Sequence, residues 1–384
     1  MRAFPVIDAL SGWRLASEPP EPAAAWLQEM LVASVVDETT GLPPAAAATA
    51  STTTTGVHAR ASVDGYAGLV GRPLTCYSPG FVTGAQLQLT LSGTGYLPVS
   101  LTAALGAQPG YPDAFQPVAV GTVSLHRTPI SLKGRVTASA APLAGAAVTL
   151  DGIWSTVASL AGAAAAPNLV ALLSPLYASR GTTATVAAQS LTAAPPAQAK
   201  TLLRPANVGD TTARLSDQVG LAVGSIIAFY PQDLARIEYA TVTAITDDGI
   251  PPNQPATVTL AFPLSRAHAA GQTVIRMIPG ATGAANTLAQ TATVGDVTLF
   301  AATMTGLDAT MQAAVVSGGA ADEYHPAAIY AATSDADGDV TLPPLHRLVQ
   351  VRLRVHAASQ PTDLLPVAVL PFAAQTLTLD LAYS

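Results

Sequence analysis

Three carboxylates alternate along one short segment, Ser334–Asp339, which reads SDADGD. Alternating carboxylates beside a glycine are typical of calcium loops, which need six to eight oxygen ligands and usually a distant bidentate glutamate. That glutamate is missing, since Arg347 and Leu348 stand in the region where it is expected. The segment is therefore predicted to be an aspartate-rich turn with Gly338 at positive φ. We predict no metal site; the candidates that would hold a metal are Asp335, Asp337 and Asp339.

The other residue types that catalyse reactions or bind metals show no diagnostic spacing. No two histidines are spaced as in HxH, HExxH or HxxxH, so zinc has no local signal. The chain contains no GxSxG elbow, no Walker loop and no GxGxxG after a strand. We predict no catalytic residue, no cofactor and no enzymatic activity, and keep a hydrolase without a recognisable motif as one alternative. The six histidines are His58, His126, His268, His325, His346 and His356.

Cys76 is the only cysteine, so no disulfide framework or cysteine-based zinc site can form within one chain. We predict that it is a small half-buried residue rather than a catalytic thiol. The motif Val-Gly-Asp occurs twice, ending at Asp210 and at Asp296. Because a catalytic site is rarely present in duplicate, both aspartates are predicted to stabilise turns.

Charged residues make up only 11 % of the 384 residues, less than half the usual share of about 25 %. Hydrophobic residues make up 49 %, which is enough for sizeable cores. A surface this poor in charge favours a chain that covers much of its outside with partner subunits. The net charge is −7, and Lys133 and Lys200 are the only lysines, so we expect no binding to nucleic acid.

The first residues show no apolar stretch followed by a small-residue cleavage site, and no apolar run reaches the ~18 residues of a membrane-spanning helix. We expect no membrane span. Heavy use of alanine is typical of bacteria with GC-rich genomes. We expect synthesis in the bacterial cytoplasm without a signal peptide, and incorporation into a particle that is cytoplasmic or released.

Short strands separated by turns rich in glycine and proline run through the chain. Val57–Val63 and Gln86–Leu91 alternate apolar and polar residues with a period of two, as half-buried strands do. Many short strands with frequent turns are typical of β-sandwiches. The sequence therefore predicts an all-β protein, with an N-terminal arm over residues 1–27 and a first β-sandwich over residues 28–127.

Two distant segments, residues 131–150 and 331–355, look like complementary parts of one further sandwich. The first reads as strand, proline-containing loop and strand, and the second as strand end, aspartate-rich turn and two strands. They are separated by 180 residues, and a loop tolerates such an insertion because closure entropy grows slowly with length. We predict a split β-sandwich formed by residues 128–155 and 330–384, with an inserted β-domain over residues 156–329.

The insert contains an internal repeat. Residues 200–210 match residues 286–296, eighty-six positions later. Glu238-Tyr239 aligns with Glu323-Tyr324 at an offset one residue shorter. The spacing survives over some forty residues, which predicts two related small β-modules side by side. Their predicted bounds are about 200–245 and 286–329.

The lead-in to the insert, residues 155–199, is rich in alanine and proline. It is predicted to be mostly linker, with one short helix near Leu169–Tyr177. Several tyrosines of the insert could form a platform for a sugar ring, but packing within strands is the favoured interpretation. These tyrosines are Tyr230, Tyr239, Tyr324 and Tyr330.

The two parts of the split sandwich resemble the carboxypeptidase-regulatory-like family of prealbumin-type, seven-stranded β-sandwiches. Residues 31–103 resemble the same family more weakly. The resemblance implies tandem prealbumin- or Ig-like sandwiches and carries no catalytic residue, because such domains assist folding, adhesion and assembly. The matching segments of the split sandwich are Gly134–Val136, Pro142–Ala146, Val148–Leu150, Thr333–Gly338 and Leu342–Leu345.

The insert modules look like short β-units of phage-tail-like and adhesin-like bacterial proteins. The whole set is similar to accessory structural proteins of phage-tail-like contractile injection systems. This resemblance implies a structural component of a large particle, in its baseplate, adapter or fibre region, whose partners are other protein subunits. The alternative is an adhesin-type module whose insert binds a cell-surface glycan or protein.

Overall fold

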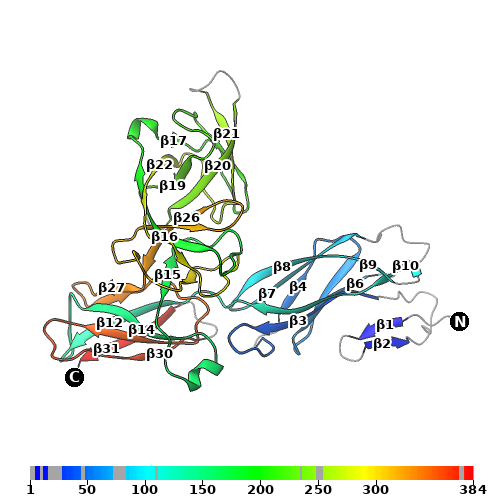
Figure 1. Ribbon diagram of the computed structural model, residues 1–384, viewed down its shortest axis with the longest axis horizontal. Coiled ribbons are helices and arrows are strands. Elements are labelled where there is room, and N and C mark those ends of the chain that lie inside the picture. Colours follow the sequence, from blue (N-terminus) through cyan, green and yellow to red (C-terminus); the bar gives the residue numbers. More distant parts are fainter. Residues whose placement is uncertain are drawn as a thin grey trace. The chain divides into compact units, whose positions relative to one another are not determined.

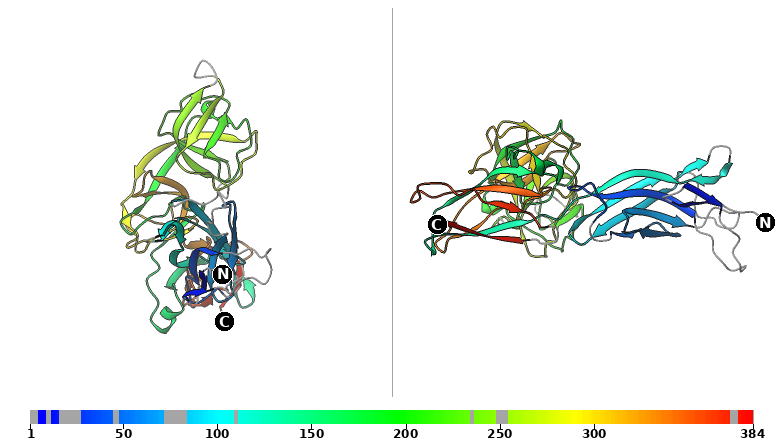
Figure 2. Two further views of the ribbon diagram at one scale, coloured as in Figure 1. Left: turned by 90° about the vertical axis from the view of Figure 1, so that its right-hand side faces the viewer. Right: turned by 90° about the horizontal axis from the view of Figure 1, so that it is seen from below.

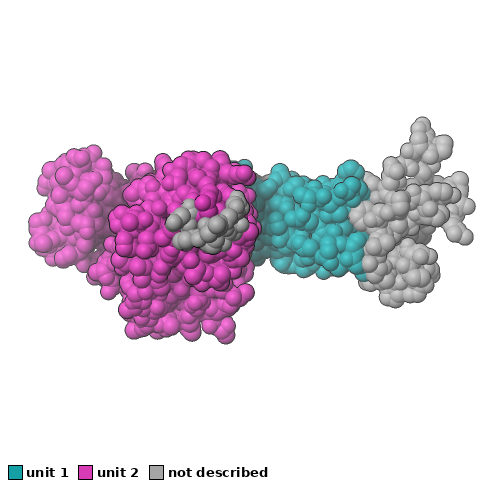
Figure 3. All heavy atoms as spheres, turned by 90° about the horizontal axis from the view of Figure 1, so that it is seen from above, with its two compact units in different colours: residues 1–128, 155–162, 371–374 teal, residues 129–154, 163–370, 375–384 magenta. Residues whose placement is uncertain are grey.

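The computed structural model describes residues 5–8, 12–15, 28–44, 48–71, 84–108, 111–233, 236–247, 254–371 and 376–383. Strands make up 53 % of the chain, and the described residues contain no α-helix, only two short 3-10 turns. The prediction of an all-β protein is confirmed (Figure 1). The chain divides into two compact units, shown in different colours in Figure 3.

Unit 1 consists of residues 1–128, 155–162 and 371–374. One of its sheets has the strand order β11-β3-β6-β5, and β4-β7-β8 form another. Strand β11 runs parallel to β3, whereas the other neighbours in these two sheets are antiparallel. The strands and the 3-10 turn of unit 1 are β1 (Pro5–Asp8), β2 (Gly12–Leu15), β3 (Gln28–Asp37), β4 (Thr49–Ser51), β5 (Val57–Ala61), β6 (Tyr66–Gly71), β7 (Gln86–Gly93), β8 (Tyr96–Ala104), β9 (Gly106–Gln108), β10 (Tyr111–Gln116), β11 (Val118–Leu125) and η1 (Ala158–Ala161).

The alternation along β7 explains how the two larger sheets of unit 1 share a core. Leu87, Leu89 and Leu91 are fully buried, whereas the residues between them are half-exposed. Successive side chains of a strand point to opposite faces, so these leucines all reach the same side. They pack in one cluster with Leu31 and Leu69 of the other sheet.

Asp37, the last residue of β3, closes the end of this core. Its carboxylate accepts hydrogen bonds from Tyr96 Oη at 2.8 Å, from Arg127 Nε at 2.9 Å and from the backbone N of Thr39 at 2.8 Å. Burial alone would raise the pKa of Asp37, but the hydrogen bonds from Thr39, Arg127 and Tyr96 outweigh it and lower the pKa from 3.8 to about 2.

We predict that Asp37→Asn costs unit 1 about 2 kcal/mol of unfolding free energy at neutral pH. The pKa is lower in the folded state, so the contribution is complete above pH 3.8 and is lost as the pH falls towards 2. The measurement is urea unfolding of wild type and variant between pH 2 and pH 7. A difference between the two proteins that does not shrink in acid would contradict the assignment.

Unit 2 consists of residues 129–154, 163–370 and 375–384. In one sheet β12 lies next to β13, β28 and β31, and a second sheet has the order β27-β14-β29-β30. Strands from the beginning of the unit therefore pair with strands from its end, and both sheets share one apolar core. We call this part the split sandwich. Its strands are β12 (Ser131–Ala138), β13 (Ala141–Pro142), β14 (Ala147–Trp154), β27 (Ala331–Thr333), β28 (Asp339–Thr341), β29 (Gln350–His356), β30 (Val367–Val369) and β31 (Thr376–Tyr383).

The chain between β14 and β27 forms one curled, twelve-stranded sheet (Figure 2). Its strands and 3-10 turn are β15 (Leu169–Leu172), β16 (Thr185–Ala193), η2 (Pro196–Gln198), β17 (Lys200–Thr201), β18 (Thr212–Leu215), β19 (Ile226–Phe229), β20 (Glu238–Asp247), β21 (Ala256–Leu260), β22 (Thr273–Thr282), β23 (Asn286–Thr287), β24 (Thr298–Phe300), β25 (Ala313–Ser317) and β26 (Glu323–Ile329).

The prediction of a short helix near Leu169–Tyr177 is wrong, because residues 169–172 form the strand β15. All four side chains of β15 are buried, and a short, fully apolar run cannot be assigned to helix or strand from its pattern alone. The prediction that the lead-in is mostly linker is also wrong. Strand β16 spans nine residues and pairs with β22, β23 and β25.

The twelve strands form two six-stranded modules with the same pairing pattern. In module A, defined as β17 to β22, β21 lies between β18 and β20, β19 lies between β20 and β22, and β17 pairs with β22. In module B, defined as β15, β16 and β23 to β26, β15 lies between β24 and β26, β25 lies between β26 and β16, and β23 pairs with β16. Each strand of one module therefore has an equivalent in the other.

The order of these strands along the chain shows two levels of insertion. Module A is continuous and lies between β16 and β23 of module B. Module B in turn lies between β14 and β27 of the split sandwich. The repeat seen in the sequence at 200–245 and 286–329 covers four strands of each module, and the other two strands of module B come from the lead-in.

The two modules are related by a local twofold arrangement. Strands β16 and β22 are equivalent and pair with each other antiparallel, with Leu191 opposite Pro279. An apolar cluster that includes Ile226, Met277 and Ala313 fills the contact. Antiparallel pairing of equivalent strands gives both modules the same surroundings on either side of this contact.

Candidate functional site

Asp335 and Asp337 lie in an exposed turn between β27 and β28, and Asp339 is the exposed first residue of β28. Oδ1 of Asp335 accepts hydrogen bonds from the backbone N of Asp337 and of Asp339, both at 2.9 Å. Gly338 has a φ of 78°, as predicted for the turn. No group of three or more metal-ligating side chains occurs among the described residues, so the structure does not bring these carboxylates together around an ion.

Five of the six histidines lie within hydrogen-bond distance of a carboxylate, at 2.6 to 3.2 Å. His58 lies on β5 and is exposed. Cys76 is outside the described residues. The histidine–carboxylate pairs are His126–Glu38, His268–Glu238, His325–Glu323, His346–Asp296 and His356–Asp363.

In module A the first residue of β20, Glu238, is fully buried. Its Oε2 lies 2.7 Å from Nε2 of His268, and its Oε1 accepts hydrogen bonds from the backbone N and Oγ of Ser265 at 2.7 and 2.8 Å. Burial raises the pKa of Glu238, but the hydrogen bonds of His268 and Ser265 bring it below its ordinary value. The glutamate therefore holds the loop before β22 against β20.

Module B repeats this arrangement with Glu323, the first residue of β26. Its Oε1 accepts a hydrogen bond from Nη2 of Arg180 at 2.6 Å, and its Oε2 accepts one from the backbone N of Tyr177 at 2.7 Å. Nε2 of His325 lies 3.1 Å from Oε2. Burial raises the pKa of Glu323, but His325 foremost, with Tyr177 and Arg180, brings it below its ordinary value.

The two clusters differ in the partner of the buried carboxylate. His268 forms a β-bridge with Ala206, and Arg180 forms the equivalent bridge with Ala292, so the histidine and the arginine hold the same place. Histidine can release its proton when it loses a carboxylate partner, whereas arginine remains charged. Module B therefore depends more strongly on its glutamate than module A does.

Tyr177 connects the two clusters across the contact between the modules. It belongs to module B, and its hydroxyl donates a hydrogen bond to Oε1 of Glu238 at 3.1 Å. The tyrosine ring stacks on His325 and on Phe262, with ring centroids 5.0 and 5.7 Å apart. Burial and the charge of Glu238 raise the pKa of Tyr177 well above its ordinary value, so the hydroxyl keeps its proton.

Ser174, His325 and Glu323 form a chain of hydrogen bonds that resembles a hydrolytic triad. Ser174 Oγ lies 2.9 Å from Nδ1 of His325, whose Nε2 faces Glu323. All three side chains are buried. Ser174 and His325 are both 0 % exposed, so the serine hydroxyl is closed off from solvent. A hydrolase needs room for its substrate beside the serine, so this arrangement stabilises the fold rather than presenting a nucleophile.

A second buried polar network joins module B to the split sandwich. Nδ1 of His346 and Nη1 of Arg347 lie 3.2 and 3.1 Å from the two carboxylate oxygens of Asp296. The backbone N of His346 donates a hydrogen bond to Oγ1 of Thr298, which also lies 2.6 Å from the hydroxyl of Tyr330. Burial raises the pKa of Asp296, but His346 foremost brings it below its ordinary value. Asp296 thus anchors the sandwich loop.

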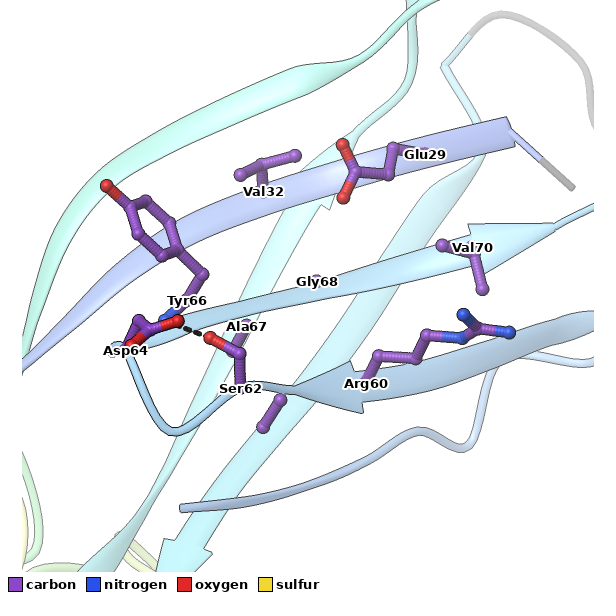
Figure 4. A pocket seen from close by; sticks show the side chains of 10 residues that line it. Glu29, Val32, Arg60, Ser62, Asp64, Tyr66, Ala67, Gly68 and Val70 are labelled. Carbon is purple, nitrogen blue, oxygen red and sulfur yellow. Dashed lines mark hydrogen bonds between the residues drawn. The ribbon is translucent and has the colours of Figure 1, made fainter. Parts of the chain in front are cut away.

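Unit 1 carries a hollow of about 320 Å³ on the outer face of its sheet β11-β3-β6-β5. Figure 4 shows Gly68 in the middle of the hollow, with Tyr66 and Asp64 towards one end and Glu29 and Arg60 towards the other. One aromatic ring, two carboxylates and a guanidinium around an apolar floor could bind a small polar ligand.

No helix among the described residues is long and apolar enough to cross a membrane. No protein-family model matches this chain, and neither the curated proteins nor the solved structures contain a match.

Proposed function

We propose that this chain is a non-enzymatic structural component of a large bacterial or phage-derived assembly, in the baseplate, adapter or fibre region of a phage-tail-like contractile injection particle. The observation that carries the proposal is the use of buried charge in unit 2. Glu238, Glu323 and Asp296 are buried. Glu238 accepts a hydrogen bond from Tyr177 of module B, Glu323 holds the backbone of Tyr177, and Asp296 binds Arg347 of the split sandwich. Carboxylates whose oxygens are occupied by such structural hydrogen bonds are not available to bind or activate a substrate.

The nested insertions support the same role. Module B is attached to the split sandwich by two chain crossings and by the network around Asp296, and module A is attached to module B in turn. Modules held at several points keep a fixed orientation relative to the split sandwich, and a subunit of an assembly requires such a fixed orientation. The low share of charged residues, 11 %, fits a surface that partner subunits cover.

We also propose that the split sandwich is of the prealbumin type and that unit 1 is a related or Ig-like sandwich. Two sheets around one core in each unit support this interpretation. A fold of this kind occurs in assembly proteins and in adhesins, so the fold alone does not distinguish these two functions.

The test is immunogold electron microscopy of gradient fractions from the native cell lysate, with an antibody against this chain. We expect label on a large particle, and its position separates baseplate, shaft and fibre. Label confined to light fractions contradicts the assembly role. That outcome would favour an adhesin-type binding protein, for which the hollow around Tyr66 and Arg60 is the specific observation and a glycan array the next measurement.

A further inference from the structure

The edge of module B that holds the split sandwich has an equivalent in module A. In module B this edge is the Val-Gly-Asp turn and the start of β24, and in module A it is the matching turn and the start of β18. Thr298 pairs with Ala171 of β15 in the same register in which Thr212 pairs with Thr259 of β21. The two edges therefore present equivalent groups at equivalent places.

The two turns also have the same internal geometry. Oδ2 of Asp296 accepts a hydrogen bond from the backbone N of Thr293 at 2.9 Å, and Oδ2 of Asp210 accepts one from Asn207 at 2.7 Å. The middle glycines have φ of 93° and 91°. Their backbone N donates to Leu176 in module B at 2.9 Å and to Leu264 in module A at 2.8 Å. The carboxylate of Asp296 also has partners outside its module. Its Oδ2 accepts a second hydrogen bond from Arg347, and its Oδ1, which accepts one from Thr293 Oγ1 at 3.1 Å, lies 3.2 Å from Nδ1 of His346.

Module B shows what those partners are. Three acceptors receive the loop of the split sandwich: the carbonyl O of Thr291, the carboxylate of Asp296 and Oγ1 of Thr298. The donors are the guanidinium of Arg347 for the first two and the backbone N of His346 for the third. Nη1 of Arg347 thus makes two of the contacts, and the backbone N of the residue before it makes the third.

Module A carries the same three acceptors in an open state. They are the carbonyl O of Pro205, the carboxylate of Asp210 and the hydroxyl of Thr212; Pro205 and Thr212 are exposed and Asp210 is half-buried. Val208 beside them is 65 % exposed. Among the described residues, no ion pair to Asp210 is formed, in contrast to Asp296.

The two edges differ in the polarity of the strand residues beside them, and this polarity affects how strongly a partner binds. In module B, Leu169, Ala171 and Phe300 pack against the core of the split sandwich. The equivalent residues of module A are Thr257, Thr259 and Arg214, and Arg214 Nη1 donates to Thr257. A polar face of this kind suits a reversible contact between subunits, whereas the apolar face suits a permanent one.

We propose that the edge formed by Pro205, Asp210 and Thr212 is a docking site for a loop of another protein subunit that presents an arginine, as the loop at His346 and Arg347 does within this chain. The inference rests on the proposed assembly function, because it names the chemistry of one partner. A second copy of this chain does not supply the loop through Arg347, since that residue is already bound to Asp296.

The test uses the full chain and a capped peptide, Leu-Pro-Pro-Leu-His-Arg-Leu, that reproduces residues 342–348. We expect saturable NMR shifts of the backbone amides around Asp210 and Thr212, with a Kd on the order of millimolar, because a short loop without an apolar anchor binds weakly. Asp210→Asn should weaken binding at least tenfold, as should replacing the peptide's arginine by glutamine.

Asp308→Asn is the matched control, since it removes an exposed turn aspartate of module B whose carboxylate, among the described residues, accepts hydrogen bonds only from Thr310. It should leave peptide binding unchanged. Absence of saturable shifts, equal binding of the glutamine peptide, or an equal effect of both asparagine variants would overturn the proposal. Each of these results leaves the particle localisation unaffected, so failure of the docking site and failure of the assembly role are distinguishable.

Discussion

Glu323→Gln lowers the unfolding free energy of module B by about 3–5 kcal/mol, the usual cost of removing one partner from a buried ion pair. The variant keeps the shape of the side chain but leaves the guanidinium of Arg180, which is 2 % exposed, without its counter-charge. Arginine cannot respond by losing its proton. The measurement is hydrogen exchange of the β25 and β26 amides across a urea series, which reports the stability of module B separately from that of unit 1.

The equivalent variant of module A provides the matched control. Glu238→Gln should cost only about 1.5–3 kcal/mol, the range for a lost charge-assisted hydrogen bond, because an imidazole, unlike a guanidinium, also exists as a neutral base near neutral pH. Arg180→His converts the module B pair into the module A type, and in that background Glu323→Gln should cost no more than Glu238→Gln does. Equal costs for the two glutamine variants in the wild-type background would contradict the distinction drawn between Arg180 and His268.

Acid should have the same effect as these substitutions. The folded-state pKa values of Glu238 and Glu323 are below their ordinary value of 4.5, so their contribution is complete above pH 4.5 and is lost as the pH falls. The glutamine variants should therefore differ from wild type at pH 7 and approach it in acid.

Two deletions of the insert should have opposite effects. Removing residues 189–282 and joining Ala188 to Gly283 by a short turn deletes module A, and the backbone N of Gly283 already donates to the carbonyl O of Ala188 at 2.8 Å. Module B keeps β15, the start of β16 and β23 to β26, so we expect it to fold. Removing residues 163–193 instead deletes β15 and β16, and we expect module B to unfold because β24, β25 and β26 lose their neighbours.

Protection of the β26 amides from hydrogen exchange distinguishes the two outcomes. The first deletion exposes part of the apolar contact around Ala313 and Tyr324, so a moderate loss of stability is expected there. Protection that survives removal of residues 163–193 would show that the lead-in is a linker after all, as the sequence predicts.

The repeat could be recognised from sequence, but the composition of the modules could not. The match of residues 200–210 with 286–296 marks β17 and β23, whose turns and spacing are fixed by local glycine and aspartate chemistry. The partners of these strands are not local. Strand β16 is 100 residues from its partner Asn286, and nothing in an alanine-rich lead-in shows that it pairs there.

The candidate site shows the same division. Glu238-Tyr239 and Glu323-Tyr324 stand out in the sequence as aligned pairs, and this was a usable signal for a repeated role. At the equivalent β-bridges the residue types differ, His268 in one module and Arg180 in the other, so no matching residue type marks these two partners. Arg180 also lies in the lead-in, and its burial depends on a module that forms around it.

The nested order of the strands also determines the order in which the parts of unit 2 can fold during translation. Module A has its last strand when residue 282 has emerged, module B needs residue 329, and the split sandwich needs β31, which ends at Tyr383. The part that is synthesised first in unit 2, β12 to β14, is thus completed last. Until then the apolar strands β12 to β14 lack their pairing partners, and their edges stay exposed while the two modules are synthesised and fold. Nascent chains stalled before residue 376 should therefore be the forms that chaperones bind and that aggregate, and the innermost module is the one that folds without waiting.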